Sequence, residues 1–228
     1  DFCLSRGLGD VYKRQFPGSG ADLFAKQFAS AGVGDEDVVY FTTTERDEDI
    51  ISTMEHFGWK KDIRIVNVAE EYYENVLAKE LEVSKYRKEG ITLRDVKTPK
   101  EDRKSDTNLL TTLTYEVSKL KPPFRLVLDS LGFFFEYYEY ARVLSAIRSI
   151  KAHTQHTESI TLLILLTGVF ETKIQSGVEE IVDCIIELER EREKQEFKRN
   201  LVIRKVRNHP EKTGVFPFDI SKNGIGMK

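Results

Sequence analysis

The alternation of short β-branched or aliphatic runs with stretches of helical periodicity constrains the fold more than any other feature of this sequence. Residues 38–42 and 160–167 are typical of buried strands, whereas residues 20–31 carry apolar side chains at helical spacing. Strands that alternate with helices form βαβ units, whose strands pair in parallel. We therefore expect an α/β fold in which helices sandwich a mostly parallel sheet.

The tail of the chain departs from this alternation. Runs at 184–189 and 201–206 flank a charged turn, which is typical of an antiparallel hairpin. Residues 72–104 are highly charged and weakly periodic, and we expect them to form a surface excursion whose role the sequence does not indicate. We predict the remaining helices at 47–57, 106–120, 136–153 and 171–182, and the remaining strands at 63–68, 124–130 and 216–220.

Length and composition bound the class of protein. With 228 residues, of which 40% are hydrophobic, the chain is long enough for one α/β domain with a sizeable core. The 35 basic and 38 acidic residues leave a net charge of −3, so no global basic field attracts nucleic acid or an anionic membrane. The longest apolar run, at 160–166, is too short to span a bilayer. Cys3 and Cys184 form neither a disulfide framework nor a metal pair, and we expect a cytoplasmic protein.

The first 15 residues stand apart from the rest of the chain. The segment DFCLSRGLGDVYKRQ has no clear period and no apolar core of a signal peptide. It resembles translated sequencing-adapter junctions at the ends of open reading frames. We therefore expect residues 1–15 to be a non-native or disordered leader, residues 16–228 to form a single domain, and the first strand of that domain to be missing.

A glycine-rich turn opens directly into the expected helix at 20–31. Backbone N–H groups that glycines leave accessible, together with the positive end of a helix, form a site for phosphate. An ordinary loop that caps a helix has a similar sequence, so both interpretations stay open for this segment alone. The candidate phosphate-binding residues are Pro17, Gly18, Ser19, Gly20, Ala21 and Asp22.

Acidic residues end two of the expected strands. Asp129 lies at the carboxyl end of the run 124–130, where open α/β sheets bind their ligands, and its carboxylate is suited to hold Mg²⁺ directly or through water. Glu45 follows the strand at 38–42 and is a candidate base that orients an attacking water. In the tail, Lys205 and Arg207 could reach a phosphate on a neighbouring subunit, although such charges also protect solvated edge strands.

Taken together, these segments resemble the KaiC-like and RadA-like branch of the RecA superfamily of P-loop ATPases. The resemblance covers residues 16–228 and is carried by the Pro-Gly-Ser-Gly turn, by YFTTTERDEDI at 40–50, by LVLDSL at 126–131 and by the tail motifs that follow Lys205. It implies a RecA-like fold, ATP and Mg²⁺ as cofactors, and a homo-oligomer that assembles through its ATPase faces. It also implies that Asp129 helps to hold Mg²⁺, that Glu45 activates water, and that Lys205 and Arg207 contact the nucleotide of the adjacent subunit.

The sequence departs from this family pattern in the phosphate loop. The family's Gly-Lys-Thr or Gly-Lys-Ser is replaced by Gly20-Ala21-Asp22, which removes the ammonium group and the Mg²⁺-binding hydroxyl. At a charge separation of ~4 Å and an effective dielectric of ~20, the repulsion between the Asp22 carboxylate and a phosphate costs about 4 kcal/mol. Two residues could relieve it, since Asp22 could ligate Mg²⁺ itself and Lys26 could turn towards the phosphates, although we expect Lys26 to pair with Asp22. Thr44 replaces the first glutamate of the family's pair.

Three hypotheses of function follow. The first is a KaiC-like ATPase-family protein with a degenerate phosphate loop, which hydrolyses ATP weakly or not at all and acts as a regulatory or scaffold subunit, with a protein partner as a further option. The second is an active Mg²⁺-dependent ATPase that uses Asp129, Glu45, Lys205 and Arg207. The third is a recombinase-like protein that binds nucleic acid, against which the acidic composition argues mildly.

Overall fold

The structure, a computed structural model, describes residues 10–15, 18–73, 84, 88, 108–166, 168–193 and 196–228. The strands are β1 (Asp10–Gln15), β2 (Asp37–Thr42), β3 (Arg64–Asn67), β4 (Phe124–Asp129), β5 (Ile160–Leu166), β6 (Cys184–Glu193), β7 (Glu196–Val206), β8 (Gly214–Ser221) and β9 (Gly224–Met227). The helices are α1 (Ala21–Ser30), α2 (Asp47–His56), α3 (Val68–Tyr72), α5 (Leu109–Ser118), α6 (Leu131–Tyr137), α7 (Tyr140–His156), α8 (Thr172–Ile181) and the 3₁₀ turn η2 (Pro210–Lys212).

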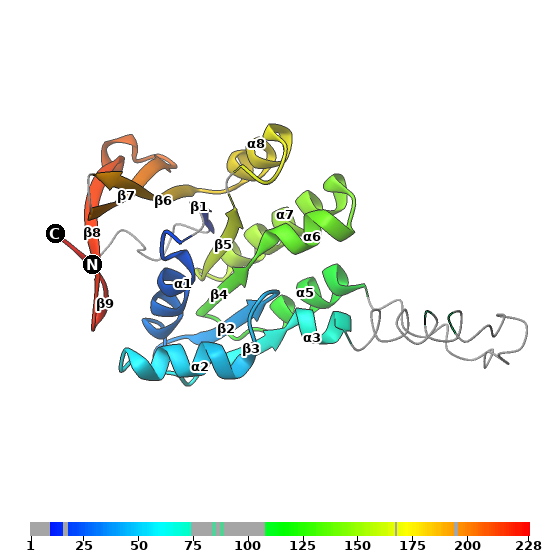
Figure 1. Cartoon of the computed structure of the whole chain (residues 1–228). Coiled ribbons are helices and arrows are strands. Elements are labelled where there is room, and N and C mark those ends of the chain that lie inside the picture. Colours follow the sequence, from blue (N-terminus) through cyan, green and yellow to red (C-terminus); the bar gives the residue numbers. More distant parts are fainter. Residues whose placement is uncertain are drawn as a thin grey trace, which may run out of the picture.

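The described residues form one mixed sheet of nine strands in the order β3-β2-β4-β5-β1-β6-β7-β8-β9. The strands from β3 to β6 in this order are parallel, and β6, β7, β8 and β9 pair antiparallel. Helices cover both faces of the parallel part (Figure 1). The expected α/β sheet between helices, with an antiparallel hairpin at its C-terminal end, is therefore confirmed.

Two apolar cores lie on the two faces of the sheet, because successive side chains of a strand point to opposite faces. In β2, Val39 and Phe41 join the core that α5, α6, α7 and α8 cover. Their neighbours Val38 and Tyr40 join the other core, which α1, α2 and part of the C-terminal sheet cover. All four of these side chains are buried. Burial on both faces explains why β2, β4 and β5 are continuous apolar runs in the sequence.

Strand β1 lies within residues 1–15, where we expected no part of the fold, and it fills the position of the first strand that we expected to be missing; that this segment is non-native stays a prediction. Residues 10–15 pair in parallel with β5 on one side and with β6 on the other, so they occupy a central position of the sheet. This position needs an extended backbone whose N–H and C=O groups bond to both neighbours. Its sequence, DVYKRQ, lacks the continuous apolar run of a central parallel strand, and apolar periodicity therefore gave no signal for it. Residues 1–9 lie outside the described residues.

The helix expected over residues 136–153 is also wrong in its bounds. Helix α6 ends at Tyr137, Tyr138 adopts an extended conformation with φ −130° and ψ 151°, and α7 begins at Tyr140. The ring of Tyr138 stacks on Phe134 with centroids 6.3 Å apart, and it packs against the core under α6. The helix is therefore interrupted at Tyr138, whose aromatic side chain packs against the core. Helical periodicity did not indicate this interruption.

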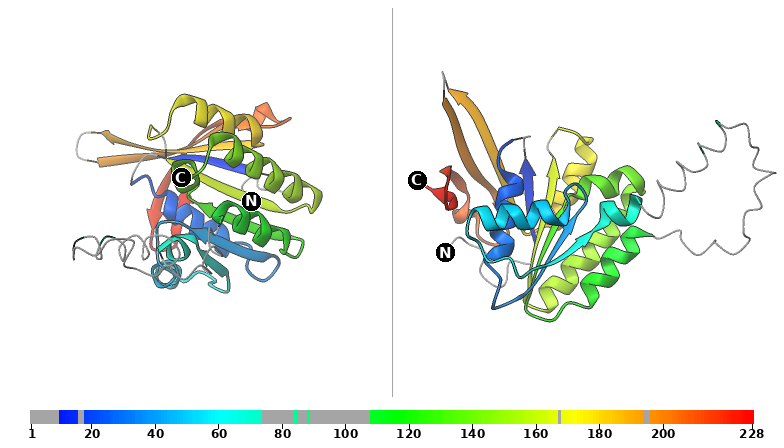
Figure 2. Two further views of the ribbon diagram at one scale, coloured as in Figure 1. Left: turned by 90° about the vertical axis from the view of Figure 1, so that its right-hand side faces the viewer. Right: turned by 60° about the horizontal axis from the view of Figure 1, so that its bottom comes forward.

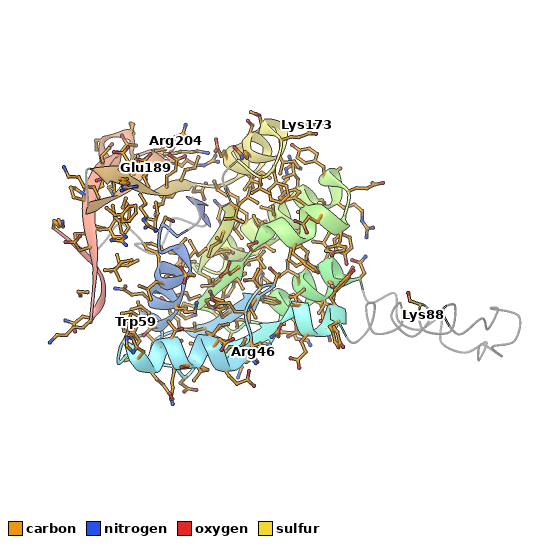
Figure 3. The ribbon with its side chains drawn as sticks, in the orientation of Figure 1. Arg46, Trp59, Lys88, Lys173, Glu189 and Arg204 are labelled. Atoms are coloured by element: carbon orange, nitrogen blue, oxygen red, sulfur yellow. The ribbon has the colours of Figure 1, made fainter. Side chains whose placement is uncertain are left out.

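The C-terminal sheet is larger than we expected. Strands β6 and β7 extend well beyond 184–189 and 201–206, and their hairpin projects from the body of the domain (Figure 2). Strand β9 was not expected at all, and it lies against α1. The Gln27 side chain donates to the Ile225 carbonyl at 3.0 Å and accepts from the Ile225 N–H at 2.8 Å. The Trp59 indole, which Figure 3 labels beside α2, donates to the Asn223 carbonyl at 3.2 Å. The tail of the chain is thereby fastened to the helix that follows the glycine-rich turn.

Two other expectations concern the charged segment at 72–104 and helices that could span a membrane. The surface excursion expected at 72–104 is described only at residues 72, 73, 84 and 88. Within the described part of the chain, no helix has both the length and the apolar character needed to cross a membrane.

Candidate functional site

The glycine-rich turn has the backbone of an anion-binding loop. Gly18 and Gly20 have φ angles of 74° and 90°, which residues with a side chain rarely adopt. Gly20 is the N-cap residue of α1 and offers no side chain to bond the N–H groups of the first helical turn. Ser19 is completely buried, and its hydroxyl has no hydrogen-bond partner among the described residues. Pro17, the first residue assigned to this loop, lies outside the described residues.

The C-terminal sheet closes over this loop. The Arg190 guanidinium donates to the Gly18 carbonyl at 3.4 Å and lies over the Phe197 ring at 3.6 Å. A Cβ atom at Gly20 would come within 2.9 Å of the Ile220 side chain. The positive φ angles, together with the close approach of Arg190 from β6 and Ile220 from β8, therefore disfavour residues with a side chain at these positions. An anion that fills this cradle would meet backbone N–H groups and the Ser19 hydroxyl, so the loop fits a phosphate group.

Ala21 and Asp22 are the first two residues of α1. Ala21 is buried and Asp22 is exposed. Neither supplies a positive charge or a hydroxyl at the helix N-terminus. The electrostatic attraction that this loop offers to phosphate therefore comes from its backbone and from the helix dipole.

Two cations lie near this chemistry among the described residues: Arg190, which contacts Gly18 of the loop, and Lys26, which we expected to pair with Asp22. That expectation is wrong, because the Lys26 ammonium lies 2.6 Å from Oε2 of Glu45. Lys26 is 1% exposed, whereas Glu45 is 30% exposed. A buried ammonium requires a carboxylate partner inside the protein, and the exposed Asp22 is not placed to be one. Glu45, the candidate water-orienting base, thus already has a cation as its neighbour.

Asp129 lies at the carboxyl end of β4, opposite Thr42 of β2, as its position in the sequence indicated. The Tyr40 hydroxyl donates to Asp129 Oδ2 at 3.0 Å. Burial raises the pKa of the Tyr40 phenol well above its ordinary value, and the negative charges of Asp129, Glu45 and Asp22 raise it further. Tyr40 therefore stays protonated and donates, and the three carboxylates act on one buried hydroxyl.

Hydrogen bonds hold the ends of β2 and β4 together at this point. The Thr43 N–H donates to the Asp129 carbonyl at 2.7 Å, and the Ser130 N–H donates to the Thr43 hydroxyl at 2.8 Å. The peptide bond between Asp129 and Ser130 is cis. The two hydrogen bonds hold the backbone on both sides of the Asp129 side chain.

The described residues contain no group of three or more His, Cys, Asp or Glu side chains arranged to hold a metal ion. Magnesium at nucleotide sites needs no such cage, because one or two carboxylates share the ion with phosphate oxygens and water. Asp129 fits this role because it ends β4 at the edge of the sheet where the loop lies. It is 7% exposed there. Asp22 is exposed at the N-terminus of α1, and its assignment as a second ligand stays a prediction.

Lys205 and Arg207 are engaged within the chain. The Lys205 ammonium donates to the Glu179 and Val182 carbonyls at 2.6 and 2.7 Å, at the end of α8. Arg207 donates to the Glu180 and Ile181 carbonyls, both at 3.3 Å. Burial lowers the pKa of Lys205, and the positive charges of Arg207 and Lys151 lower it further. These cations cap a helix C-terminus, and their expected contact with the nucleotide of a neighbouring subunit stays a prediction.

Two contacts of the site were not foreseen. Apolar residues surround Lys26 in α1, and a lysine on the buried face of a helix is a signal that its ammonium has an internal partner. No sequence feature indicated that the partner is Glu45, because residues 26 and 45 meet only when α1 and β2 pack. Tyr40 lay in an apolar run and was treated as core, although a buried tyrosine hydroxyl usually has a hydrogen-bond partner.

Comparison with known proteins agrees with this geometry. Residues 16–228 match the family model described as "ATPase: KaiC", and the chain therefore belongs to the KaiC ATPase family. The KaiC-like protein PH0186 from the hyperthermophilic archaeon Pyrococcus horikoshii OT3 has a similar solved structure, with a TM-score of 0.61 and 23% sequence identity. The similarity covers 96% of this chain and 89% of that one, and it supports the RecA-like fold. A search of curated protein sequences gave no match.

Proposed function

We propose that this domain is a KaiC-family subunit with a degenerate phosphate loop, which binds ATP weakly, hydrolyses it slowly or not at all, and acts as a regulatory or scaffold component. The observation that carries the proposal is the pair Ala21 and Asp22 at the start of α1. The family resemblance assigns these positions to the lysine that contacts the β- and γ-phosphates and to the hydroxyl that ligates Mg²⁺. Both groups are absent, and a negative charge stands in place of the second.

The rest of the site supports binding better than catalysis. Gly18, Ser19 and Gly20 would hold the phosphates, and Asp129 would hold Mg²⁺, which supplies charge neutralisation at the transferred phosphoryl group when it is bound. Glu45 would orient a water molecule, but its carboxylate lies against the Lys26 ammonium. A carboxylate oxygen that contacts an ammonium is not free to accept a hydrogen bond from a water molecule, so this contact disfavours hydrolysis.

Assembly is the remaining part of the proposal. The family resemblance implies a homo-oligomer that forms through the ATPase faces. In this chain, carbonyls at the end of α8 hold the Lys205 ammonium and the Arg207 guanidinium, and Arg207 also pairs with the Asp183 carboxylate, so these groups form a fixed surface on which Arg207 is exposed. We infer that this surface meets the acidic edge of the site on a second copy, which carries Asp22 and Glu45, and that the oligomer does not require ATP turnover.

Release of inorganic phosphate from ATP in the presence of Mg²⁺ tests the proposal. We expect the purified chain to release phosphate no faster than the Asp129→Asn variant, because the loop supplies neither its lysine nor its hydroxyl. Asp129→Asn keeps the shape of the side chain and removes the charge on which Mg²⁺ would depend, so it reports the background rate.

A rate clearly above that background would refute the proposal. It would favour the second candidate, an active Mg²⁺-dependent ATPase. The specific observation in favour of that candidate is that Asp129 and Glu45 follow neighbouring strands at the same edge of the sheet, as an active site would require.

A further inference from the structure

Lys26 is a buried charge that the proposed function does not use. It is the sixth residue of α1, the helix whose N-terminus forms the phosphate loop. Side chains of a helix lean towards its N-terminus, so the Lys26 ammonium lies nearer to the loop than its Cα atom does. Its contact with Glu45, which follows the carboxyl end of β2, places the ammonium at the ligand-binding edge of the sheet.

Negatively charged side chains lie near Lys26, and a bound phosphate would need a cation among them. Asp129 accepts a hydrogen bond from the Tyr40 hydroxyl, and the negative charges of Asp129, Glu45 and Asp22 all raise the pKa of Tyr40. Within the described part of the chain, Lys26 is the cation in contact with the Glu45 carboxylate of this group. A triphosphate that enters such a site is repelled unless a cation becomes available to it.

The contact between Lys26 and Glu45 is of a kind in which another anion could replace Glu45 as the partner of the ammonium. Oε2 of Glu45 has no hydrogen bond within the described part of the chain, although the ammonium lies 2.6 Å away, so the ion pair lacks hydrogen-bond geometry at this oxygen. Glu45 is 30% exposed and lines an open cavity of about 550 Å³ together with Thr44, Asn67 and Tyr73. Glu45 can therefore turn into water without being left as a buried unpaired charge.

We propose that Lys26 supplies the cation that the phosphate loop lacks: when ATP binds, its ammonium exchanges Glu45 for an oxygen of the terminal phosphate. The proposal rests on the weak nucleotide binding proposed above. It adds that the phosphate-binding lysine of this site lies in the second turn of α1, whereas the family resemblance places it at the first residue of that helix. It also gives Glu45 two states, paired with Lys26 in the empty site and released when a nucleotide is bound.

Calorimetric titration with ATP in a double-mutant cycle tests this proposal. The four proteins are the unmodified chain, Lys26→Met, Ala21→Lys with Asp22→Thr, and the combination of all three substitutions. We expect Lys26→Met to weaken ATP binding by about tenfold or more in the native loop. In the restored loop, where the introduced lysine would contact the phosphates, the same change should alter the dissociation constant by less than about twofold.

Two further variants separate this role from a structural one. Lys26→Arg keeps the charge and should retain most of the affinity, and Glu45→Gln frees the ammonium and should tighten ATP binding. Lys121→Met is the matched control, because Lys121 is exposed before β4, at the opposite end of that strand from Asp129. Thermal unfolding of each variant verifies that the fold is retained.

An equal loss of affinity from Lys26→Met in both loops would overturn the proposal, since a structural role does not depend on the loop. Undiminished binding by Lys26→Met in the native loop would also overturn it. If the unmodified chain binds no ATP while the restored loop does, the Lys26 proposal and the weak ATP binding both fail, and the proposed loss of turnover through the degenerate loop stands. Phosphate release by the unmodified chain would instead contradict the proposed function and leave the binding role of Lys26 intact.

Discussion

Restoring the phosphate loop by Ala21→Lys together with Asp22→Thr is expected to tighten ATP binding by about a thousandfold. The change removes one negative charge from the N-terminus of α1 and adds an ammonium beside the bound phosphates. Removing the repulsion alone is worth about 4 kcal/mol at a separation of ~4 Å and an effective dielectric of ~20. Isothermal titration calorimetry with ATP and Mg²⁺ measures the result directly.

The single substitutions serve as controls for this prediction. Asp22→Thr removes the repulsion without adding a cation, and it should therefore account for most of the gain. Asp22 is exposed, so its replacement disturbs no packed core, whereas Ala21 is buried in the apolar core beside α1, and thermal unfolding must verify that the Ala21→Lys variants keep the fold. An unchanged dissociation constant in the double variant would show that Ala21 and Asp22 do not limit nucleotide binding.

Asp183→Ala is expected to lower the free energy of unfolding by about 3–5 kcal/mol, because it breaks a buried charge network. Asp183 is 3% exposed in the turn between α8 and β6. Its carboxylate lies 2.6 Å from the Lys151 ammonium and 2.5 Å from Nε of Arg207, and it accepts from the Gln155 amide at 2.9 Å. Without it, the largely buried Lys151 loses its carboxylate and Arg207 loses its anchor.

Urea denaturation of the two proteins measures this effect. The matched control is Asp219→Ala, whose carboxylate lies 2.9 Å from the Lys228 ammonium with both side chains more than half exposed. An exposed pair of this kind contributes about 0–1 kcal/mol, so the control should change stability little. Similar losses in the two variants would contradict the account, because burial would then not distinguish the two pairs.

The sequence predicted the parts of this molecule that depend on local patterns. The strands β2, β4 and β5 are continuous apolar runs, and Asp129 stands at the end of one of them because a parallel strand ends where its buried run ends. The glycine-rich turn was predicted because positive φ angles require glycine. Both features are fixed within a few consecutive residues.

The contacts that the sequence did not predict join distant segments. Lys26 was assigned to Asp22 because the two residues share a helix face, but the packing of α1 on β2 brings the Glu45 carboxylate to a buried ammonium. Lys205 and Arg207 donate hydrogen bonds to carbonyls at the end of α8, which the sequence did not indicate, and their expected contact with a neighbouring subunit stays a prediction. The sequence did not predict strand β1, because its pairing with β5 and β6 defines it and its residues show no apolar periodicity.

The central claim is that the fold of an ATPase is retained around a loop that lacks the lysine and the hydroxyl side chain of the family's phosphate loop. Calorimetric titration of the unmodified chain with ATP and Mg²⁺ tests it most directly. The account predicts weak binding, with a dissociation constant above about 100 μM, because backbone N–H groups and Lys26 act without a loop lysine. A dissociation constant of about 1 μM or below would contradict it, because the loop would then hold ATP as tightly as an intact one.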